Sequence, residues 1–314
     1  MNKRKIFSVV VALFMLIAFS AAMGFAEGQK EAKPKVESDP DTLVYAAMSQ
    51  ERAPVVAERM EGLLEYVAEV TGKKTEIYLT TSYAAQIEAM LGGFAHIANF
   101  GPFAYVKATE RDPNIEAFAT YVVESMPEYF VPGGPKYVGM LVTKKGSQYT
   151  SIDSLKGEDV AFSDPGSTSG WLVPNVLFTK RELGGSSLDD YFGELIFAGS
   201  HDAAILAVLE ERVSAAFTWD SAPYRLWKRG EMGRPDKELN VLWTSPDIPL
   251  DPYSYRTELN DDLKAKIRKA FLTWHEKPES KKFFESIGAT KFVEMQDSDY
   301  DVTRELAEAM KEAE

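Results

Sequence analysis

The sequence predicts an α/β fold of two lobes, with the chain crossing from the first lobe to the second and back. Short β-rich runs alternate with segments whose apolar residues recur at helical spacing, a pattern that predicts mainly parallel sheets covered by helices on both faces. The same alternation starts again after Thr143, and 314 residues are enough for two ordinary domains. Proteins of this kind bind ligands in the cleft, at the carboxyl ends of strands and the N-termini of helices.

The first lobe is expected to comprise residues 42–143 together with 246–314. Its β-rich runs predict strands at 42–48, 76–79, 97–100, 117–123, 137–143 and 253–255. Apolar periodicity predicts helices at 54–70 and 84–91, a helix that opens at Pro102, and helical structure from the last strand to the C-terminus. Gly72 stands where a helix C-cap belongs, and Pro102 suits the first turn of a helix, where no backbone N–H is needed.

The second lobe is expected at residues 144–245. Its predicted strands are 159–163, 195–197, 215–219 and 241–243. Its predicted helical segments are a capped turn at 151–157, an apolar helix that begins near Trp171, and helices at 202–211 and 221–229. We expect the two lobes to be joined by a hinge of two strands near Thr143 and Trp243.

The N-terminus has the order of a secretory signal peptide, predicted at residues 1–26. A basic patch at 3–5 is followed by an apolar run at 6–19 and by small residues up to Ala26, where cleavage is expected. The alternative is a membrane anchor, but the apolar run is shorter than the roughly 20 residues that cross a bilayer. Residues 27–41 are charged and lack apolar periodicity, so they are expected to form a disordered leader.

Charge and composition argue against several classes of partner. The net charge of the whole chain is −13, and removing the three positive charges of the signal changes it to −16. An acidic chain without a basic stripe is not expected to bind nucleic acid or anionic lipid. The chain has no cysteine, which excludes disulfides and a lipid anchor on an N-terminal Cys. Its three histidines lack the spacing of a metal site, so we expect no metal and no cofactor.

The segment 164–170 is a candidate anion site. Three consecutive hydroxyl residues, Ser167, Thr168 and Ser169, lie where a strand is expected to turn into a helix. Their hydroxyls, the first free N–H groups and the helix dipole would all favour a bound anion. The alternative is a plain N-cap, although a cap needs only one hydroxyl. His201 begins another predicted helix, where it either donates to an oxyanion or is a capping or surface residue.

These segments resemble the motifs of a known family, the phosphate/phosphite/phosphonate-binding proteins of ABC importers. The resemblance is most specific at 164–174, which reads DPGSTSGWLVP. Weaker matches follow the family's order along the chain: TSYAAQIEAM at 81–90, GSHDAA at 199–204 and SPDIPLDP at 245–252.

The resemblance implies a type II periplasmic binding protein fold that closes on its ligand about the hinge. It implies a shell for the phosphonate oxygens made by Ser167, Thr168, Ser169 and His201. It also implies that Tyr83 and Tyr137 line the cleft and that Asp251 is the acid that faces the ligand. Taken alone, either tyrosine is more commonly a core or lobe-surface residue.

Two positions depart from the family pattern. Family members that bind aminoalkylphosphonates carry a second acid after the strand at 213–219, whereas here Asp220 comes one place early. Asp220 either replaces that acid or caps the next helix. The bulky Trp219 beside it is expected to shrink the cleft. These departures leave the organic group of the ligand open, including whether it carries an amine.

The resemblance therefore implies a solute-binding component of an ABC importer, located in the periplasm, that passes its ligand to a permease in the inner membrane. The expected ligand is a small phosphorus oxyanion: phosphite, an alkylphosphonate or an aminoalkylphosphonate. We expect a monomer without enzymatic activity. The alternatives are a binder of a sulfonate or nitrogen heterocycle with the same fold, and a secreted hydrolase. The hydrolase is disfavoured because 167–169 is not a G-x-S-x-G elbow.

Overall fold

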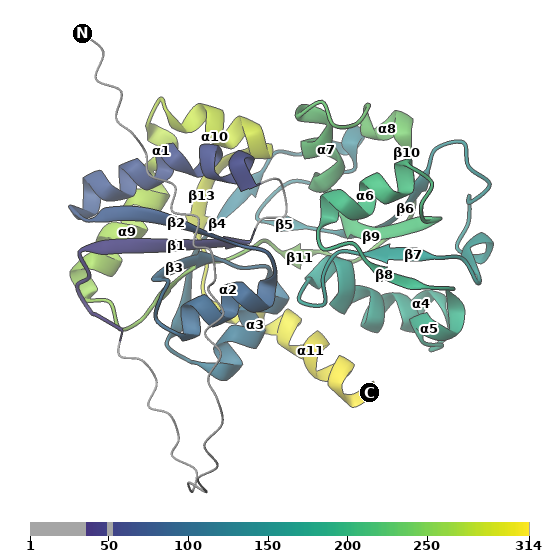
Figure 1. Cartoon of the computed structure of the whole chain (residues 1–314), viewed down its shortest axis with the longest axis horizontal. Coiled ribbons are helices and arrows are strands. Elements are labelled where there is room, and N and C mark those ends of the chain that lie inside the picture. The colour runs from purple at the N-terminus through teal and green to yellow at the C-terminus, as the bar shows by residue number, and fades with distance from the viewer. Residues whose placement is uncertain (1–35, 49–52, 314) are drawn as a thin grey trace, which may run out of the picture. The chain divides into compact units, whose positions relative to one another are not determined.

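The computed structural model describes residues 36–48 and 53–313, within a compact unit at Pro34–Glu314. The predicted signal peptide and most of the predicted leader lie outside the described residues. The two α/β lobes expected from the sequence are confirmed: a six-stranded and a five-stranded sheet are joined by a two-stranded one (Figure 1). Among the residues described, no helix is long and apolar enough to span a bilayer.

The sheet of the first lobe has the strand order β13-β4-β12-β3-β1-β2. Its strands are β1 (Thr42–Met48), β2 (Lys74–Thr80), β3 (Ile97–Asn99), β4 (Ile115–Val123), β12 (Tyr253–Arg256) and β13 (Ala289–Glu294). Helices α1 (Ala53–Thr71), α9 (Asp261–Thr273) and α10 (Ser280–Ile287) cover one face, and α2 (Tyr83–Leu91) and α3 (Pro102–Arg111) cover the other (Figure 1). Alternation along β1 explains this: Leu43, Tyr45 and Ala47 join one hydrophobic cluster, whereas Ala46 and Met48 join the other.

The sheet of the second lobe has the strand order β10-β6-β9-β7-β8. Its strands are β6 (Gly139–Lys144), β7 (Val160–Phe162), β8 (Leu195–Phe197), β9 (Ala215–Trp219) and β10 (Leu239–Thr244). Its longer helices are α6 (His201–Leu209) and α7 (Ser221–Lys228). The remaining helical segments are the π-helical η3 (Thr168–Leu172) and η4 (Pro174–Phe178), α4 (Thr179–Glu182), α5 (Leu188–Tyr191), α8 (Pro235–Glu238) and the short turn η2 (Asp153–Leu155).

The link between the lobes differs from the expected hinge. Thr143 and Trp243 lie inside the second sheet, where β6 and β10 pair antiparallel. The connection is instead the two-stranded pair of β5 (Lys136–Tyr137) and β11 (Ile248–Pro249). The expected strand 137–143 is therefore two strands, because the N–H of Val138 donates to the carboxylate of Asp220 and interrupts the ladder. By sheet membership, the second lobe begins at β6.

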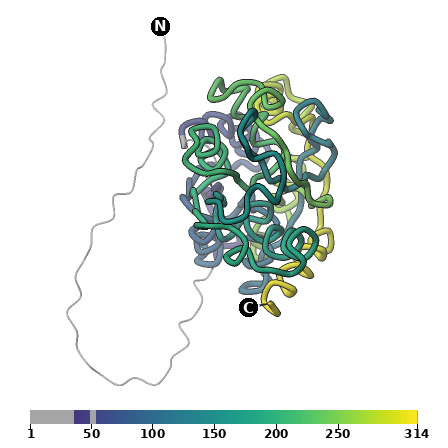
Figure 2. The backbone as a smooth tube through the Cα atoms, turned by 90° about the vertical axis from the view of Figure 1, so that its right-hand side faces the viewer, coloured from purple at the N-terminus to yellow at the C-terminus, as the bar shows by residue number. Residues whose placement is uncertain are grey.

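The C-terminal helix also connects the lobes. Helix α11 (Asp301–Ala313) follows the short turn η6 (Asp297–Tyr300) and contacts α3 of the first lobe and η3 and η4 of the second. Leu172 of η3 shares a buried cluster with Ala307 of α11 and Ala104 of α3. Figure 2 shows the yellow C-terminal segment beside the teal segment of the second lobe. The turn that begins η3 is thus held from both lobes.

Mainly parallel sheets were a wrong prediction, because both sheets are mixed. In the first sheet β1 pairs parallel with β2 and β3, but β12 pairs antiparallel with β3 and β4, and β13 pairs antiparallel with β4. The reason is the double crossing: β4 precedes the second lobe and β12 follows it, so the returning chain runs in the opposite direction. Helical structure to the C-terminus was also wrong, since β13 lies between α10 and η6.

The leader is shorter than expected. The N–H of Asn260 donates to the carbonyl of Ser38 at 2.8 Å, and Lys73 pairs with Asp39 at 2.8 Å. Val36 is buried. Residues 36–41 are therefore tied to the first lobe by local contacts that their charged composition does not reveal.

The strand β13 contributes Phe292 to an aromatic cluster in the core of the first lobe. Its ring lies 5.0 Å from Tyr253, 5.3 Å from Phe271 and 5.3 Å from Phe284, centre to centre. We expect Phe292→Ala to lower the free energy of unfolding by about 3–5 kcal/mol, because it removes this packing and leaves a cavity. Urea unfolding measures the change. Lys291→Ala, on the exposed face of the same strand, is the control, and a loss below ~1 kcal/mol for Phe292→Ala would contradict the packing.

Candidate ligand-binding site

The residues predicted to form the site meet, with one exception, around a small cavity between the lobes. The cavity is lined by Tyr83, Gly101, Tyr137, Ser167, Thr168, Ser169, His201, Trp219 and Asp251. Its water-accessible volume is about 10 Å³, enough for roughly one water molecule. Asp220 is the predicted residue that the structure does not bring to this cavity.

Ser167 caps the helical turn and also contacts His201. Its backbone is extended (φ −78°, ψ 138°), and its Oγ accepts from the N–H of Gly170 at 3.0 Å. The same Oγ lies 3.2 Å from Nε2 of His201, whose Nδ1 lies 3.2 Å from Oγ1 of Thr218. The turn begins at Thr168, three residues before the expected helix start near Trp171. Ser167 is thus an N-cap that also lines the cavity, and its contact with an anion stays a prediction.

Thr168 joins the lobes at the cavity. Its Oγ1 accepts a hydrogen bond of 2.9 Å from the N–H of Phe103, in the first turn of α3. The N-terminal ends of α3, η3 and α6 therefore all lie at the cavity, through Gly101, Thr168 and His201. Helix N-termini carry unpaired N–H groups and partial positive charge, which favours an anion there.

His201 lines this cavity as a neutral imidazole. Burial lowers the pKa of His201 to about 3, because the charged form would lose its hydration. Burial and the nearby Asp251 also raise the pKa of Tyr137 well above its usual range, and that of Tyr83 likewise. The phenols remain protonated and able to donate. The cavity thus offers neutral hydrogen-bond donors. A fixed positive charge in their place would have attracted inorganic anions of many kinds.

Asp251 is the one carboxyl group that the described residues contribute to the cavity wall, and hydrogen bonds hold its backbone. Its carbonyl accepts from Oγ1 of Thr120 at 3.0 Å, and the preceding carbonyl of Leu250 accepts from the Tyr300 hydroxyl at 2.8 Å. Burial raises the pKa of Asp251 to about 7, although Arg225 opposes the shift. Near neutral pH this carboxyl group therefore holds or releases a proton readily.

Asp220 is fully buried and has a structural role. Its Oδ2 accepts from the N–H of Val138 at 2.9 Å, and its Oδ1 accepts from the Ser221 hydroxyl at 2.9 Å. Burial raises the pKa of Asp220 to about 7, while these two hydrogen bonds oppose the shift. The carboxylate thus braces the end of the interlobe link, a role that neither sequence interpretation included.

Two glycines from different lobes make room for Tyr83. A Cβ at Gly101 would lie 3.0 Å from Cε1 of Tyr83, and a Cβ at Gly166 would lie 2.6 Å from its Cβ. Sequence reasoning singled out neither glycine as a site residue. The available signal was their position at the start of helices, beside Pro102 and Ser167.

Among the residues described, no group of three or more His, Cys, Asp or Glu side chains is arranged to hold a metal ion. The side chains of the cavity wall are hydroxyls, phenols, one imidazole, one indole and one carboxyl group. Hydroxyl, phenol and imidazole groups are able to donate hydrogen bonds to an oxyanion.

Comparison with known proteins agrees with this geometry. Residues 45–300 match the family model described as "ABC transporter, phosphonate, periplasmic substrate-binding protein". The chain belongs to this family. The resemblance inferred from the motifs is therefore confirmed, and the family is one of periplasmic transport components.

Individual members of the family are similar over most of their length. The phosphonates-binding periplasmic protein of Escherichia coli (strain K12) is 29% identical over 284 residues, which cover 86% of this chain and 77% of the relative. The phosphate-import protein PhnD of Mycolicibacterium smegmatis is 27% identical over 239 residues, covering 75% of this chain and 72% of the relative.

Solved structures show the same fold. A binding protein component of an ABC phosphonate transporter from Pseudomonas aeruginosa has a TM-score of 0.76 and 27% identity, with 87% of each chain covered. PhnD1 from Prochlorococcus marinus, in complex with methylphosphonate, has a TM-score of 0.70 and 16% identity, covering 87% of this chain and 99% of that one.

The raised pKa of Asp251 predicts a pH-dependent cost in stability. An unfolded Asp titrates near pH 3.9, so between about pH 4 and 7 the folded state binds more protons and stability falls as pH rises. Asn does not titrate. We expect Asp251→Asn to match wild type at pH 4 and to exceed its free energy of unfolding by ~4 kcal/mol at pH 8, about 1.4 kcal/mol for each pKa unit of the shift. Urea unfolding across this range measures the difference, with the exposed Asp247→Asn as control, and a difference independent of pH would refute the burial of this carboxyl group.

Proposed function

We propose that this protein binds a small phosphorus oxyanion in the cavity between its lobes and delivers it to an ABC permease. The observation that carries the proposal is the cavity wall itself, where hydroxyl, phenol and imidazole groups from both lobes surround one carboxyl group. Phosphite, phosphate and short alkylphosphonates have the matching chemistry: several oxygen acceptors and, near neutral pH, an acidic P–OH group.

The hydroxyl segment would hold the oxyanion. Ser169 and Thr168 lie in the first turn of η3, with the backbone N–H groups of that turn beside them. Hydrogen bonds to a charged acceptor contribute roughly 1.5–3 kcal/mol each, about twice a neutral bond. The net negative charge of the chain repels anions at long range. The affinity for an oxyanion would therefore come from neutral hydrogen-bond donors in a cavity that holds little water.

Asp251 would select among anions. A carboxylate beside a bound anion is repelled unless one of the two carries a proton to share. A monoprotonated phosphonate or phosphite provides that proton, and the raised pKa of Asp251 matches such sharing. A sulfonate has no proton near neutral pH and could share only a proton held by Asp251, whereas a monoprotonated phosphonate or phosphite brings its own. We therefore favour phosphorus oxyanions over the sulfonates and heterocycles that remained as alternatives.

An amine on the ligand is not required by this geometry. The second acid that would face an ammonium group is Asp220 in the sequence pattern, but its two oxygens accept from Val138 and Ser221. The names of the relatives from Escherichia coli, Mycolicibacterium smegmatis and Pseudomonas aeruginosa include phosphonates and phosphate. Simple oxyanions of phosphorus are the ligands that fit both observations.

Several further features of the proposal rest on the sequence and the family. The signal-like segment 1–26 would direct export and be cleaved after Ala26. The mature protein would act as a monomer in the periplasm and would turn over no substrate. Binding would close the lobes about the β5–β11 link, which is the two-stranded connection between the sheets.

The ligand class is tested by thermal shift and calorimetry. We expect phosphite or methylphosphonate to stabilise the mature chain by about 2.7 kcal/mol at a hundredfold excess over Kd, and methanesulfonate to leave Tm unchanged. Thr168→Val should weaken binding at least tenfold, because it removes a hydroxyl from the oxyanion shell. Thr303→Val, a buried threonine on α11, is the matched control. If phosphite, phosphate and methylphosphonate all leave Tm unchanged, the ligand class is wrong.

Closure of the lobes is tested at Gly166. A methyl group there would lie 2.6 Å from Cβ of Tyr83, an atom fixed by the backbone of the opposite lobe. We expect Gly166→Ala to keep the lobes apart, giving a larger radius of gyration with ligand than wild type and at least tenfold weaker binding. Gly62→Ala is the control, because its Cβ would meet Trp274 at an ordinary 3.4 Å. Scattering and affinity equal to wild type would show that closure does not need the Tyr83 slot.

A further inference from the structure

We propose that Trp219 limits the size of the ligand, acting as a partition between the oxyanion cavity and a larger chamber behind it. The proposal rests on the proposed function, because it concerns the substituent of the same phosphorus ligand. The wild-type protein would then bind a ligand with no substituent larger than methyl. The chamber has room for a longer alkyl group, but the indole of Trp219 blocks access to it.

Two cavities share part of their lining. The oxyanion cavity and a second cavity are both lined by His201, Trp219 and Asp251. The second cavity has a water-accessible volume of about 70 Å³, compared with about 10 Å³ for the first. A substituent that extends from the oxyanion cavity past this wall would therefore enter the second cavity, which we call the rear chamber.

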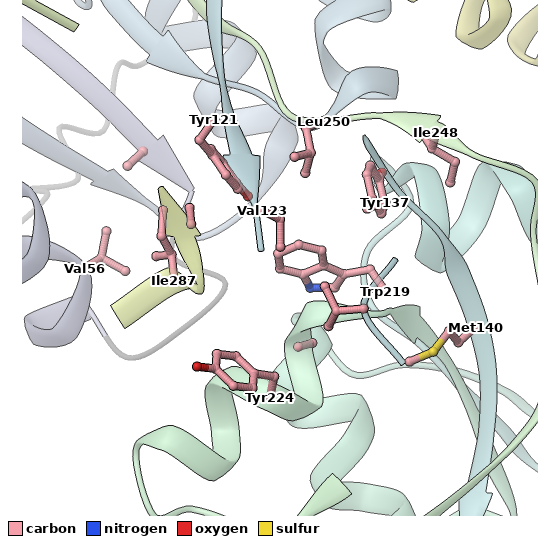
Figure 3. Packing of buried hydrophobic residues seen from close by; sticks show 14 of the residues in the cluster. Val56, Tyr121, Val123, Tyr137, Met140, Trp219, Tyr224, Ile248, Leu250 and Ile287 are labelled. Carbon is pink, nitrogen blue, oxygen red and sulfur yellow. The ribbon is translucent and has the colours of Figure 1, made fainter. Parts of the chain in front are cut away.

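The indole of Trp219 is fixed in this wall. It ends β9, where it pairs with Gly139, and its side chain is only 8% exposed. The ring of Tyr137 packs edge-to-face against it at 5.8 Å, and the guanidinium of Arg225 lies 4.6 Å from its ring centre. Figure 3 shows the indole between Tyr137 and the segment that carries Tyr121 and Val123. A ring held by neighbours on several sides does not move aside without cost.

Trp219 is also the wall residue that provides size selection without binding the oxyanion. His201 and Asp251 belong to the proposed oxyanion shell, so their loss would remove binding itself. The indole offers a single donor and mainly excludes volume. The rear chamber has a mixed lining, in which the charged Arg59, Asp202 and Arg225 stand beside aromatic and aliphatic side chains. An alkyl group would pack against the apolar part, which includes Val56, Met60 and Phe283.

Calorimetry with a homologous series tests the partition. The probes are phosphite and methyl-, ethyl- and propylphosphonate, titrated into the mature wild type, Trp219→Ala and Trp219→Phe. In wild type we expect affinity to fall at least tenfold with each CH₂ beyond methyl. In Trp219→Ala each CH₂ should instead strengthen binding by up to about fourfold, the value of burying one methylene, and Trp219→Phe should lie between.

Trp243→Phe is the matched control, because Trp243 is equally buried at 8% but lies in the core of the second lobe. It should keep the wild-type dependence on chain length. The partition is overturned if wild type binds propylphosphonate as tightly as methylphosphonate, or if the folded Trp219 variants keep the wild-type dependence. Should Trp219→Ala show no cooperative melt, Trp219→Phe decides alone. Failure of the proposed function gives a different result, in which wild type binds no member of the series.

Discussion

The hydrogen bond from Phe103 N–H to Thr168 Oγ1 joins the first turn of α3 to the first turn of η3, and the site depends on this meeting of two lobes. Neither turn alone surrounds a ligand. Together they bring side-chain hydroxyls around a space of about one water molecule, with α11 packed against both helices. Because the two turns belong to different lobes, the proposed closure about β5 and β11 would bring them together and complete the site.

Burial of polar groups is the second constraint on this site. His201 is kept neutral, the phenols of Tyr83 and Tyr137 stay protonated, and two carboxyl groups have raised pKa values. Asp220 and Asp251 offset the cost of burying a carboxyl group in different ways. Asp220 accepts two hydrogen bonds within the protein and braces the interlobe link, whereas Asp251 lies on the cavity wall, where a protonated ligand would share its proton. Chemically identical side chains would thus serve structure at Asp220 and, in the proposed function, ligand selection at Asp251.

Many elements of the fold were predictable because their signals are local. The strands 42–48, 195–197 and 215–219 were placed with their observed bounds, and Gly72 ends α1 with a positive φ. The wrong predictions share a cause, because the features concerned depend on contacts between segments that are distant in the sequence. The mixed strand directions of the first sheet follow from the double crossing of the chain. Segment 289–294 is a strand because it pairs with β4 and packs Phe292 into the aromatic cluster. The expected strand 137–143 is divided at Val138 because the N–H of Val138 donates to Asp220.

By itself, the sequence determined the two-lobe α/β class, the family and the three hydroxyls that begin η3, since periodicity, turn residues and a contiguous motif are written in neighbouring positions. Only the tertiary structure decided which of the candidates meet. It placed Tyr83, Tyr137, His201 and Asp251 around the hydroxyl segment and Trp219 in the lining of two cavities. It also paired Asp220 with Val138 and Ser221, away from the oxyanion cavity. The physical reason is that each of these roles depends on contacts between residues far apart in the sequence. Side-chain packing and the hydrogen-bond partners of buried polar groups determine these contacts, and no single position encodes them.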